Sequence, residues 1–133
     1  MELTTKPNSD HLHEASLETM HAQNREWLSE VDFRIEEMAF FYNLIHMREP
    51  HIFFPTAGLA DLERQLITLT SEHLLNLKMG IESHERTLAK IVKNISLDEE
   101  YGYRVSHRRL LEEMNKLQEG IRNFKKSVFA FVN

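Results

Sequence analysis

The fold of this chain is decided by residues 24–47, which read NREWLSEVDFRIEEMAFFYNLIHM. Apolar side chains recur there at intervals of three and four residues and form one stripe: Leu28, Val31, Ile35, Met38, Tyr42 and Ile45. Trp27 and Phe41 widen this stripe. This period places the side chains along one side of an α-helix and does not fit a strand. The stretch therefore predicts a long helix with one face in a core.

The same stretch carries a second apolar set. At about 100° per residue, Phe33, Phe40, Leu44 and Met47 fall on the opposite side of the helix. A helix in a simple three-helix bundle needs only one buried stripe, so a second stripe implies a further layer. Two interpretations stay open, namely cover by another part of this chain and contact with another chain or partner.

Composition favours one helical domain. The chain has 133 residues, of which 28% are charged, with only four glycines and three prolines. This length suits a single domain, and few turn-forming residues beside many charged ones favour long helices. The predicted fold class is all-α.

Turn signals divide the chain into three helices of similar length. We expect residues 1–8 to be a disordered lead-in and residues 9–133 to form a single domain. The first helix begins after a cap at Ser9 or Asp10, and the second begins near Thr56 or Ala57. A capping box at Ser96 starts the third helix directly after the second has ended at residue 94 or 95. Short connections predict an antiparallel up-down-up bundle that resembles a coiled coil.

Apolar stripes are also predicted on the other two helices. On the second helix, Leu74, Ile81 and Val92 flank a stripe made of Leu59, Leu62, Leu66, Leu69, Leu77, Leu88, Ile91 and Ile95. The third helix is expected to bury Tyr103, Leu110, Leu111, Met114, Leu117, Ile121, Phe124, Val128 and Val132.

Aligning the three helices places all eight phenylalanines in the half of the rod that contains the first loop. Phe53 and Phe54 lie in that loop, and Phe129 and Phe131 lie near the end of the third helix. Aromatic side chains and Met supply much of the contact area at interfaces. The candidate interface is therefore Phe33, Phe40, Leu44, Met47, Phe53, Phe54, Phe129 and Phe131. The alternative is that this wide end is simply the core of the domain.

Histidines on the apolar stripes give a second candidate site. The same alignment puts His21, His84 and His107 at one level, and Glu18 lies one turn before His21. Three neutral imidazoles can bind a zinc-like divalent metal and leave a position open for water. Two other interpretations remain. One is a pH-sensitive packing switch. The other is a buried polar layer in which His21, Asn24, His84 and His107 form hydrogen bonds with one another, together with Gln118 and His73. Gly80 lies between His73 and His84 on the same face of the second helix, and its lack of a side chain would make room for Trp27 or for a ligand.

Several classes of function lose support. The sequence lacks the glycine-rich phosphate loop, the nucleophile elbow, the His-Glu-x-x-His pair and the calcium loop, and it has no cysteine. A net charge of -5 argues against nucleic acid, and the basic residues of the third helix, Arg104, Arg108, Arg109, Arg122, Lys125 and Lys126, spread around it. No apolar run is long enough for a membrane span, and we expect a cytoplasmic protein.

The segment 21–37 contains Asn-Arg-Glu-Trp-Leu-Ser-Glu-Val-x-Phe, followed by glutamates. This segment resembles the first helix of uncharacterised bacterial helical-bundle proteins. The resemblance implies a bacterial cytosolic bundle, and no activity or functional residue comes with it.

The sequence thus leads to two hypotheses. The first is a non-enzymatic bundle that acts by protein–protein association, with itself or another helical protein as partner and with no cofactor. The alternative is a metal-binding protein or metal-dependent enzyme that uses His21, His84, His107 and Glu18.

Overall fold

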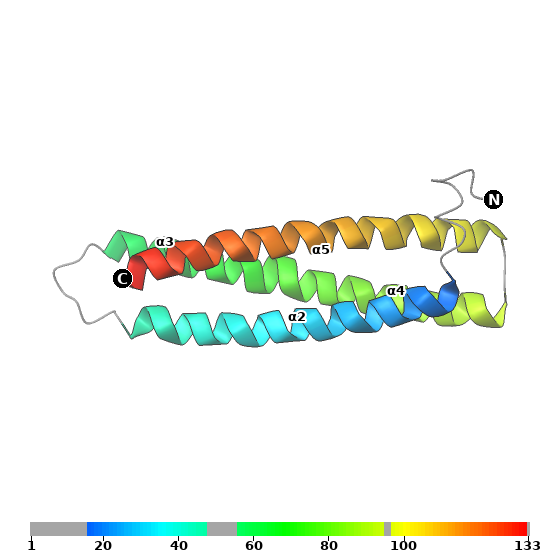
Figure 1. Cartoon of the computed structure of the whole chain (residues 1–133), viewed down its shortest axis with the longest axis horizontal. Helices are drawn as coiled ribbons and strands as arrows, with labels where there is room; N and C mark the ends of the chain where they lie inside the picture. The colour runs from blue at the N-terminus through cyan, green and yellow to red at the C-terminus, as the bar shows by residue number, and fades with distance from the viewer. Residues whose placement is uncertain (1–15, 48–55, 95–96, 133) are drawn as a thin grey trace, which may run out of the picture.

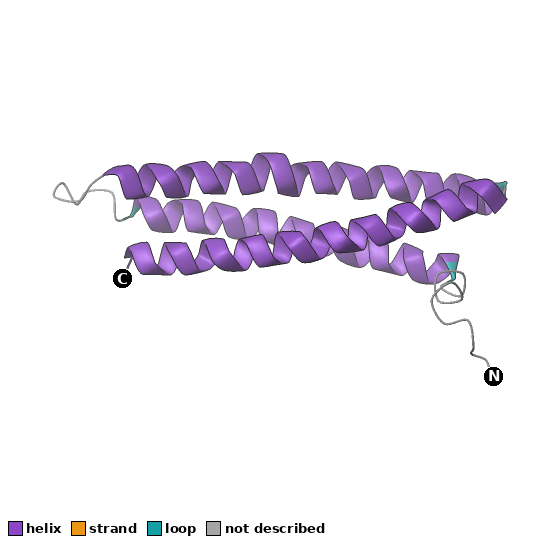
Figure 2. Cartoon of the chain, turned by 90° about the horizontal axis from the view of Figure 1, so that it is seen from above, coloured by secondary structure: helices purple, strands orange, loops and turns teal. Residues whose placement is uncertain are grey.

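A computed structural model describes residues 16–47, 56–94 and 97–132. Three long helical rods pack against one another in alternating directions, and no strand occurs in these residues (Figures 1 and 2). The elements in chain order are α2 (Leu17–His46), α3 (Thr56–Ile67), η1 (Thr68–Leu74), α4 (Leu75–Lys93) and α5 (Leu97–Val132). The predicted all-α bundle of three helices is confirmed.

The described part of the first rod begins at an N-cap. Ser16 has an extended backbone, and its hydroxyl oxygen accepts a hydrogen bond from the backbone N–H of Thr19 at 2.9 Å. This contact satisfies one of the donors that the first turn of α2 leaves free. The long helix therefore starts at Leu17, several residues after the start predicted from a cap at Ser9 or Asp10. Ser9, Asp10 and the predicted lead-in themselves lie outside the described residues.

The second rod has the predicted ends. It begins at Thr56, and α4 ends at Lys93, with Asn94 as its C-cap. Its interior differs from the prediction, because η1 is a π-helix of seven residues between α3 and α4. A π-turn contains one more residue than an α-turn.

This extra residue shifts which side chains face the core. Buried Leu66 and buried Leu74 stand eight residues apart, one more than a heptad, and the regular three- and four-residue spacing resumes after Leu74. Leu74 and Ile81 are among the most buried side chains, so the prediction that they flank the stripe was wrong. It assumed one unbroken α-helical period.

The third rod begins at Leu97, and three acidic residues in its first turn suit the positive end of the helix dipole: Asp98, Glu99 and Glu100. The predicted capping residue, Ser96, lies outside the described residues. Arg104, predicted on a basic surface, is buried and forms an ion pair with Glu100 at 2.7 Å.

On α2 the core stripe is centred slightly away from its predicted position. Trp27 and Phe41, predicted at its margin, are buried, whereas Tyr42 is exposed. Leu111 on α5 is exposed as well, so its predicted burial was wrong. Tyr42 follows the better-buried Phe41, and Leu111 follows the better-buried Leu110. Both lie at the edge of an apolar stripe, where a rotation of the helix by a few tens of degrees decides whether a side chain is buried.

The core has two parts. The larger cluster runs from Trp27 to the aromatic end of the rod, and the smaller one contains Met20, Leu88, Ile91 and Tyr103. Buried polar side chains, including Asn24, His84 and His107, lie between these two clusters. Along its length the bundle therefore has an aromatic half, a polar layer and a short apolar end.

Candidate functional site

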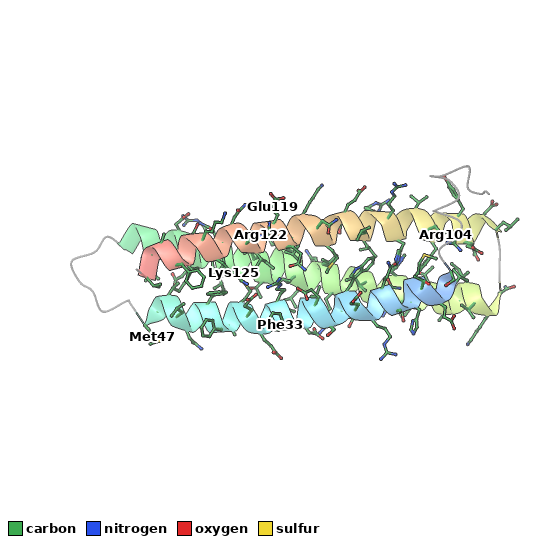
Figure 3. All side chains as sticks on the ribbon, viewed as in Figure 1. Phe33, Met47, Arg104, Glu119, Arg122 and Lys125 are labelled. Atoms are coloured by element: carbon green, nitrogen blue, oxygen red, sulfur yellow. The ribbon has the colours of Figure 1, made fainter. Side chains whose placement is uncertain are left out.

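The second apolar set on α2 faces outward. Phe33, Phe40 and Met47 are 54%, 59% and 73% exposed, while Leu44 is half-buried against the core. Figure 3 places Phe33 near the middle of α2 and Met47 at its end. These four residues are called the α2 face below. Within the described residues, no part of the chain covers its three outermost side chains.

The α2 face has the period of a helix-packing stripe. Phe33, Phe40 and Met47 stand seven residues apart, and Leu44 lies four residues after Phe40. Glu37 occupies the position of this pattern between Phe33 and Phe40, but its carboxylate turns toward Lys125 and Arg34. A seven-residue repeat is the spacing at which two helices can pack along one line.

The C-terminal part of helix α2 has no charged residue at an exposed position. The exposed residues after Glu37 are Ala39, Phe40, Tyr42, Asn43 and Met47. More than a quarter of the whole chain is charged, so a stretch of this kind on an outer helix face is unusual here. Large apolar patches on soluble proteins mark contact sites more often than scattered single residues do.

An aromatic cluster supports this face from inside. The ring of Phe41 meets those of Phe40, Phe124 and Phe129 edge-on, with centroids 5.4, 6.0 and 5.9 Å apart. Phe129 is 46% exposed, and Phe131 is half-buried against the core. Part of the predicted interface therefore lies together at this end. Phe53 and Phe54 lie outside the described residues.

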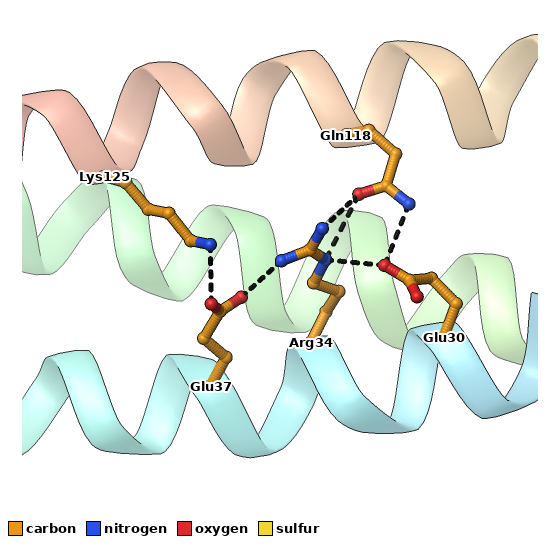
Figure 4. Close-up of polar contacts among 5 residues, drawn as sticks. All are labelled: Glu30, Arg34, Glu37, Gln118 and Lys125. Atoms are coloured by element: carbon orange, nitrogen blue, oxygen red, sulfur yellow. Dashed lines mark hydrogen bonds and ion pairs between the residues drawn. The ribbon is translucent and has the colours of Figure 1, made fainter.

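A polar network fixes α2 against α5 beside this face (Figure 4). The guanidinium of Arg34 donates to the carbonyl oxygen of Gln118 at 2.8 Å and to Glu37 at 2.8 Å. Gln118 in turn donates to Glu30 at 3.0 Å, and Lys125 pairs with Glu37 at 2.6 Å. Five side chains from two helices thus set the register between the helices.

Partial burial alone would raise the pKa of Glu37. The hydrogen bonds and positive charges of Lys125 and Arg34 outweigh that effect and hold the pKa below its usual value. Glu37 therefore stays ionised at neutral pH, and its charge is used within the bundle.

The polar layer is built around Asn24, which is fully buried. Its amide nitrogen donates to Glu85 and to the hydroxyl of Tyr103, both at 2.9 Å. Glu85 also pairs with Nδ1 of His21 at 2.5 Å. Three rods are joined in this way through one amide.

His84 and His107 form the second part of the polar layer. Nε2 of His84 lies 3.0 Å from Nδ1 of His107, and Nε2 of His107 lies 2.7 Å from the side-chain oxygen of Gln23. Because that oxygen only accepts, His107 must carry its proton on Nε2 and accept from His84 on Nδ1. The rings form a stacked column, with His84 on Tyr103 (3.8 Å between centroids) and His107 on Trp27 (4.6 Å).

Burial keeps the stacked rings of this layer neutral. It lowers the pKa of both His84 and His107 to about 4, helped at His84 by His107 and at His107 by Arg104. Burial also raises the pKa of Tyr103 to about 12. All three side chains are therefore uncharged at pH 7.

The structure brings together two of the three histidines that the metal hypothesis needs. His84 and His107 are in contact, but His21 turns to Glu85, and Glu18 lies at the edge of a separate apolar hollow with His21. Within residues 16–47, 56–94 and 97–132, no three His, Asp or Glu side chains are placed so that they could hold a metal ion.

The predicted polar layer is correct for Asn24, His84 and His107. It was wrong for Gln118, which belongs to the Arg34 network, and for His73, which is exposed. The role of Tyr103 in this layer was not predicted from the sequence. Its position four residues before His107, on the same helix face, was the available signal.

None of the described helices is both long and apolar enough to cross a bilayer. Comparison with protein-family models, curated proteins and solved structures finds no match to this chain. The resemblance of segment 21–37 to bacterial helical-bundle proteins stays a prediction.

Proposed function

We propose that this protein acts by protein–protein association, that its partner is a second copy of itself, and that it associates through the α2 face. The observation that carries the proposal is the row of Phe33, Phe40 and Met47, which is exposed at heptad spacing on a helix whose opposite side already fills the core. A helix with two apolar faces needs a packing partner on each face, and a second copy of the chain would cover the outer one.

The geometry around the α2 face supports the proposal. The Arg34 network and the Phe41 aromatic cluster hold α2 in place from behind, so the exposed side chains project from a rigid helix. A preformed surface loses less conformational entropy on binding than a flexible one.

The available area indicates moderate affinity. Phe33, Phe40, Met47 and Phe129 are each about half exposed or more, and large side chains of this kind bury roughly 150–250 Å² when fully covered. Four such side chains offer about 400 Å², roughly half of what one partner contributes to a typical stable interface. The association should therefore depend on protein concentration.

No enzymatic role is proposed. His84, His107 and Tyr103 are buried between the helices, and of the polar layer's network only the outer members, His21 and Glu85, line the apolar hollow beside Leu88. We further infer a cytosolic protein, a location that suits the lack of cysteine.

Sedimentation velocity over a wide range of protein concentration tests the proposal. The wild type should form larger species as concentration rises, and a Phe33→Glu/Phe40→Glu variant should stay monomeric, because each carboxylate would lose hydration in the contact. Ala22→Glu is the matched control, an exposed residue on the same helix three turns before Phe33. A wild type that is monomeric at all concentrations would rule out self-association.

A further inference from the structure

A continuous groove runs between the second rod and α5. Two hollows of about 420 and 390 Å³ make up this groove, and they share Leu69, His73 and Gly120. The groove extends along α5 from Leu110 to Ser127, about 25 Å at the rise of an α-helix. No residue of α2 lines it, so it lies on the side of the bundle away from α2.

Leucines form the floor of the groove, and polar side chains form its rims. Leu69, Leu77, Leu110 and Leu117 line the larger hollow. The π-helix contributes several of the other lining residues, among them His73. π-Turns occur frequently at functional sites.

Two glycines open this groove without being required by the packing of the chain itself. A Cβ atom on Gly120 would meet only Leu69, at 3.8 Å, and one on Gly80 would meet only Leu110, at 4.0 Å. Both distances are ordinary contacts, so alanine would fit at either position. Glycine inside a helix costs about 1 kcal/mol relative to alanine. Glycines at these two places are explained if another backbone approaches closely there.

We propose that this groove receives the α2 face of a second copy of the chain. The inference rests on the proposed function and names the surface that receives the face. Phe33 to Met47 span about 21 Å along α2, which matches the 25 Å groove. The apolar side chains then meet a floor of leucines, and the two glycines let the helix settle between the rods.

The charges on the rims favour this occupant over a charged helix. Glu72 and Glu113 would repel an acidic helix, and Arg64 and Lys116 would repel a basic one. Of the residues from Phe33 to Met47, Glu36 is the one exposed charged residue, and the exposed residues from Ala39 to Met47 carry no charge and meet neither repulsion.

The two surfaces lie on opposite sides of one bundle. A contact between unlike surfaces is heterologous, and it leaves one free α2 face and one free groove on every pair. The assembly therefore grows by addition of copies, whereas an α2 face that met another α2 face would stop at a dimer.

Separate variants of the two surfaces test this inference by sedimentation velocity. Gly120→Glu and Gly80→Glu each place a carboxylate in the groove, and Phe33→Glu/Phe40→Glu removes the α2 face. Each variant alone should be monomeric. An equimolar mixture of a groove variant with the α2-face variant should form a 1:1 dimer, because each partner keeps the surface that the other has lost. Gly102→Glu is the matched control on α5, where a Cβ meets nothing within 4 Å, and it should behave like wild type.

The outcomes separate the inference from the proposed function. If both groove variants associate like wild type while the α2-face variant does not, α2 faces pair with each other, and only the inference is overturned. A mixture that stays monomeric also overturns the inference. If the α2-face variant associates like wild type, the proposed function fails together with the inference. Helical circular dichroism with an unchanged melting temperature establishes that each variant is folded.

Discussion

The Nε2 atom of His84 lies 3.0 Å from the Nδ1 atom of His107, and this hydrogen bond crosses from the second rod to the third inside the bundle. A proton added to Nδ1 of His107 would set two N–H donors against each other. The bond in this direction, with His84 as donor, therefore exists only while His107 is neutral, and protonation of His107 requires His84 to change its tautomer.

Stability should fall as the medium becomes acidic. The pKa of both imidazoles is about 4 in the folded chain, below their ordinary value of 6.5. Between these two values the unfolded chain binds more protons, so the free energy of unfolding should decrease as pH falls from about 6.5 to about 4. The slope is at most about 1.4 kcal/mol per pH unit for each imidazole.

Urea unfolding at a series of pH values measures this slope. A His84→Gln variant is the control, since an amide can still donate to His107 and does not titrate, and its slope should be clearly smaller. Equal slopes for the two proteins would contradict the assignment.

Replacing Asn24 should destabilise the fold strongly. Asn24→Ala removes both hydrogen bonds of the buried amide and leaves Glu85 and Tyr103 without that donor. We expect a loss of about 2–3 kcal/mol in the free energy of unfolding, typical of buried polar groups left unpaired. Asn76→Ala, at an exposed position, is the control and should change stability by less than about 0.5 kcal/mol. Equal effects of the two substitutions would argue against a structural role for the polar layer.

The Glu37–Lys125 pair should show a measurable coupling. Its side chains are 14% and 29% exposed, and the pair links α2 to α5. A double-mutant cycle with Glu37→Gln and Lys125→Met should give a coupling energy of about 1 kcal/mol, toward the upper end for exposed pairs. The contribution should be present above the ordinary pKa of 4.5 and lost as pH falls through the lowered pKa of Glu37. The same cycle with exposed Lys126 in place of Lys125 should give a value near zero.

Self-association should not weaken with salt. The exposed residues of α2 from Ala39 to Met47 are uncharged and Glu36 is the one exposed charge between Phe33 and Ala39, so screening has little attraction to remove, and apolar contacts persist at high ionic strength. The dissociation constant from sedimentation equilibrium should stay constant or decrease between low and high sodium chloride. A marked increase would mean that charged residues hold the copies together.

Deleting one residue from the π-helix should be tolerated. Without Ser71, Leu66 and Leu74 would stand seven residues apart, and an α-helix could continue through the segment. The loss of stability should be small beside that from deleting Ser83, which would rotate every later core residue of α4 and cost about 4 kcal/mol or more. Thermal melts of the two deletions provide the comparison. Similar losses would show that η1 does not absorb a change of register.

Much of the bundle was predictable because its helices follow simple periods. The stripe on α2 and the turn signals at Thr56 and Asn94 are local properties of the sequence, and they gave the three helices. The π-helix was not predictable in this way. Its only trace is the eight-residue interval between Leu66 and Leu74, which the broad apolar composition of the second helix conceals.

The polar layer was only partly predictable. Counting residues from the turns gave the right level for His84 and His107, because helices rise equally per residue. Counting does not tell which way a side chain at the edge of a stripe turns. His21 had a carboxylate within reach, on Glu85 of the neighbouring rod, and pairs with it instead of meeting His84 and His107.

The π-turn also divides the backbone hydrogen bonds of the second rod into two ladders. Its seven residues carry i→i+5 hydrogen bonds, as in the bond from the N–H of Leu75 to the carbonyl oxygen of Thr70, and interrupt the α-helical ladder. The ladders of α3 and α4 are therefore separate, and the apolar cluster that contains both Leu66 and Leu74 holds the two parts of the rod in line.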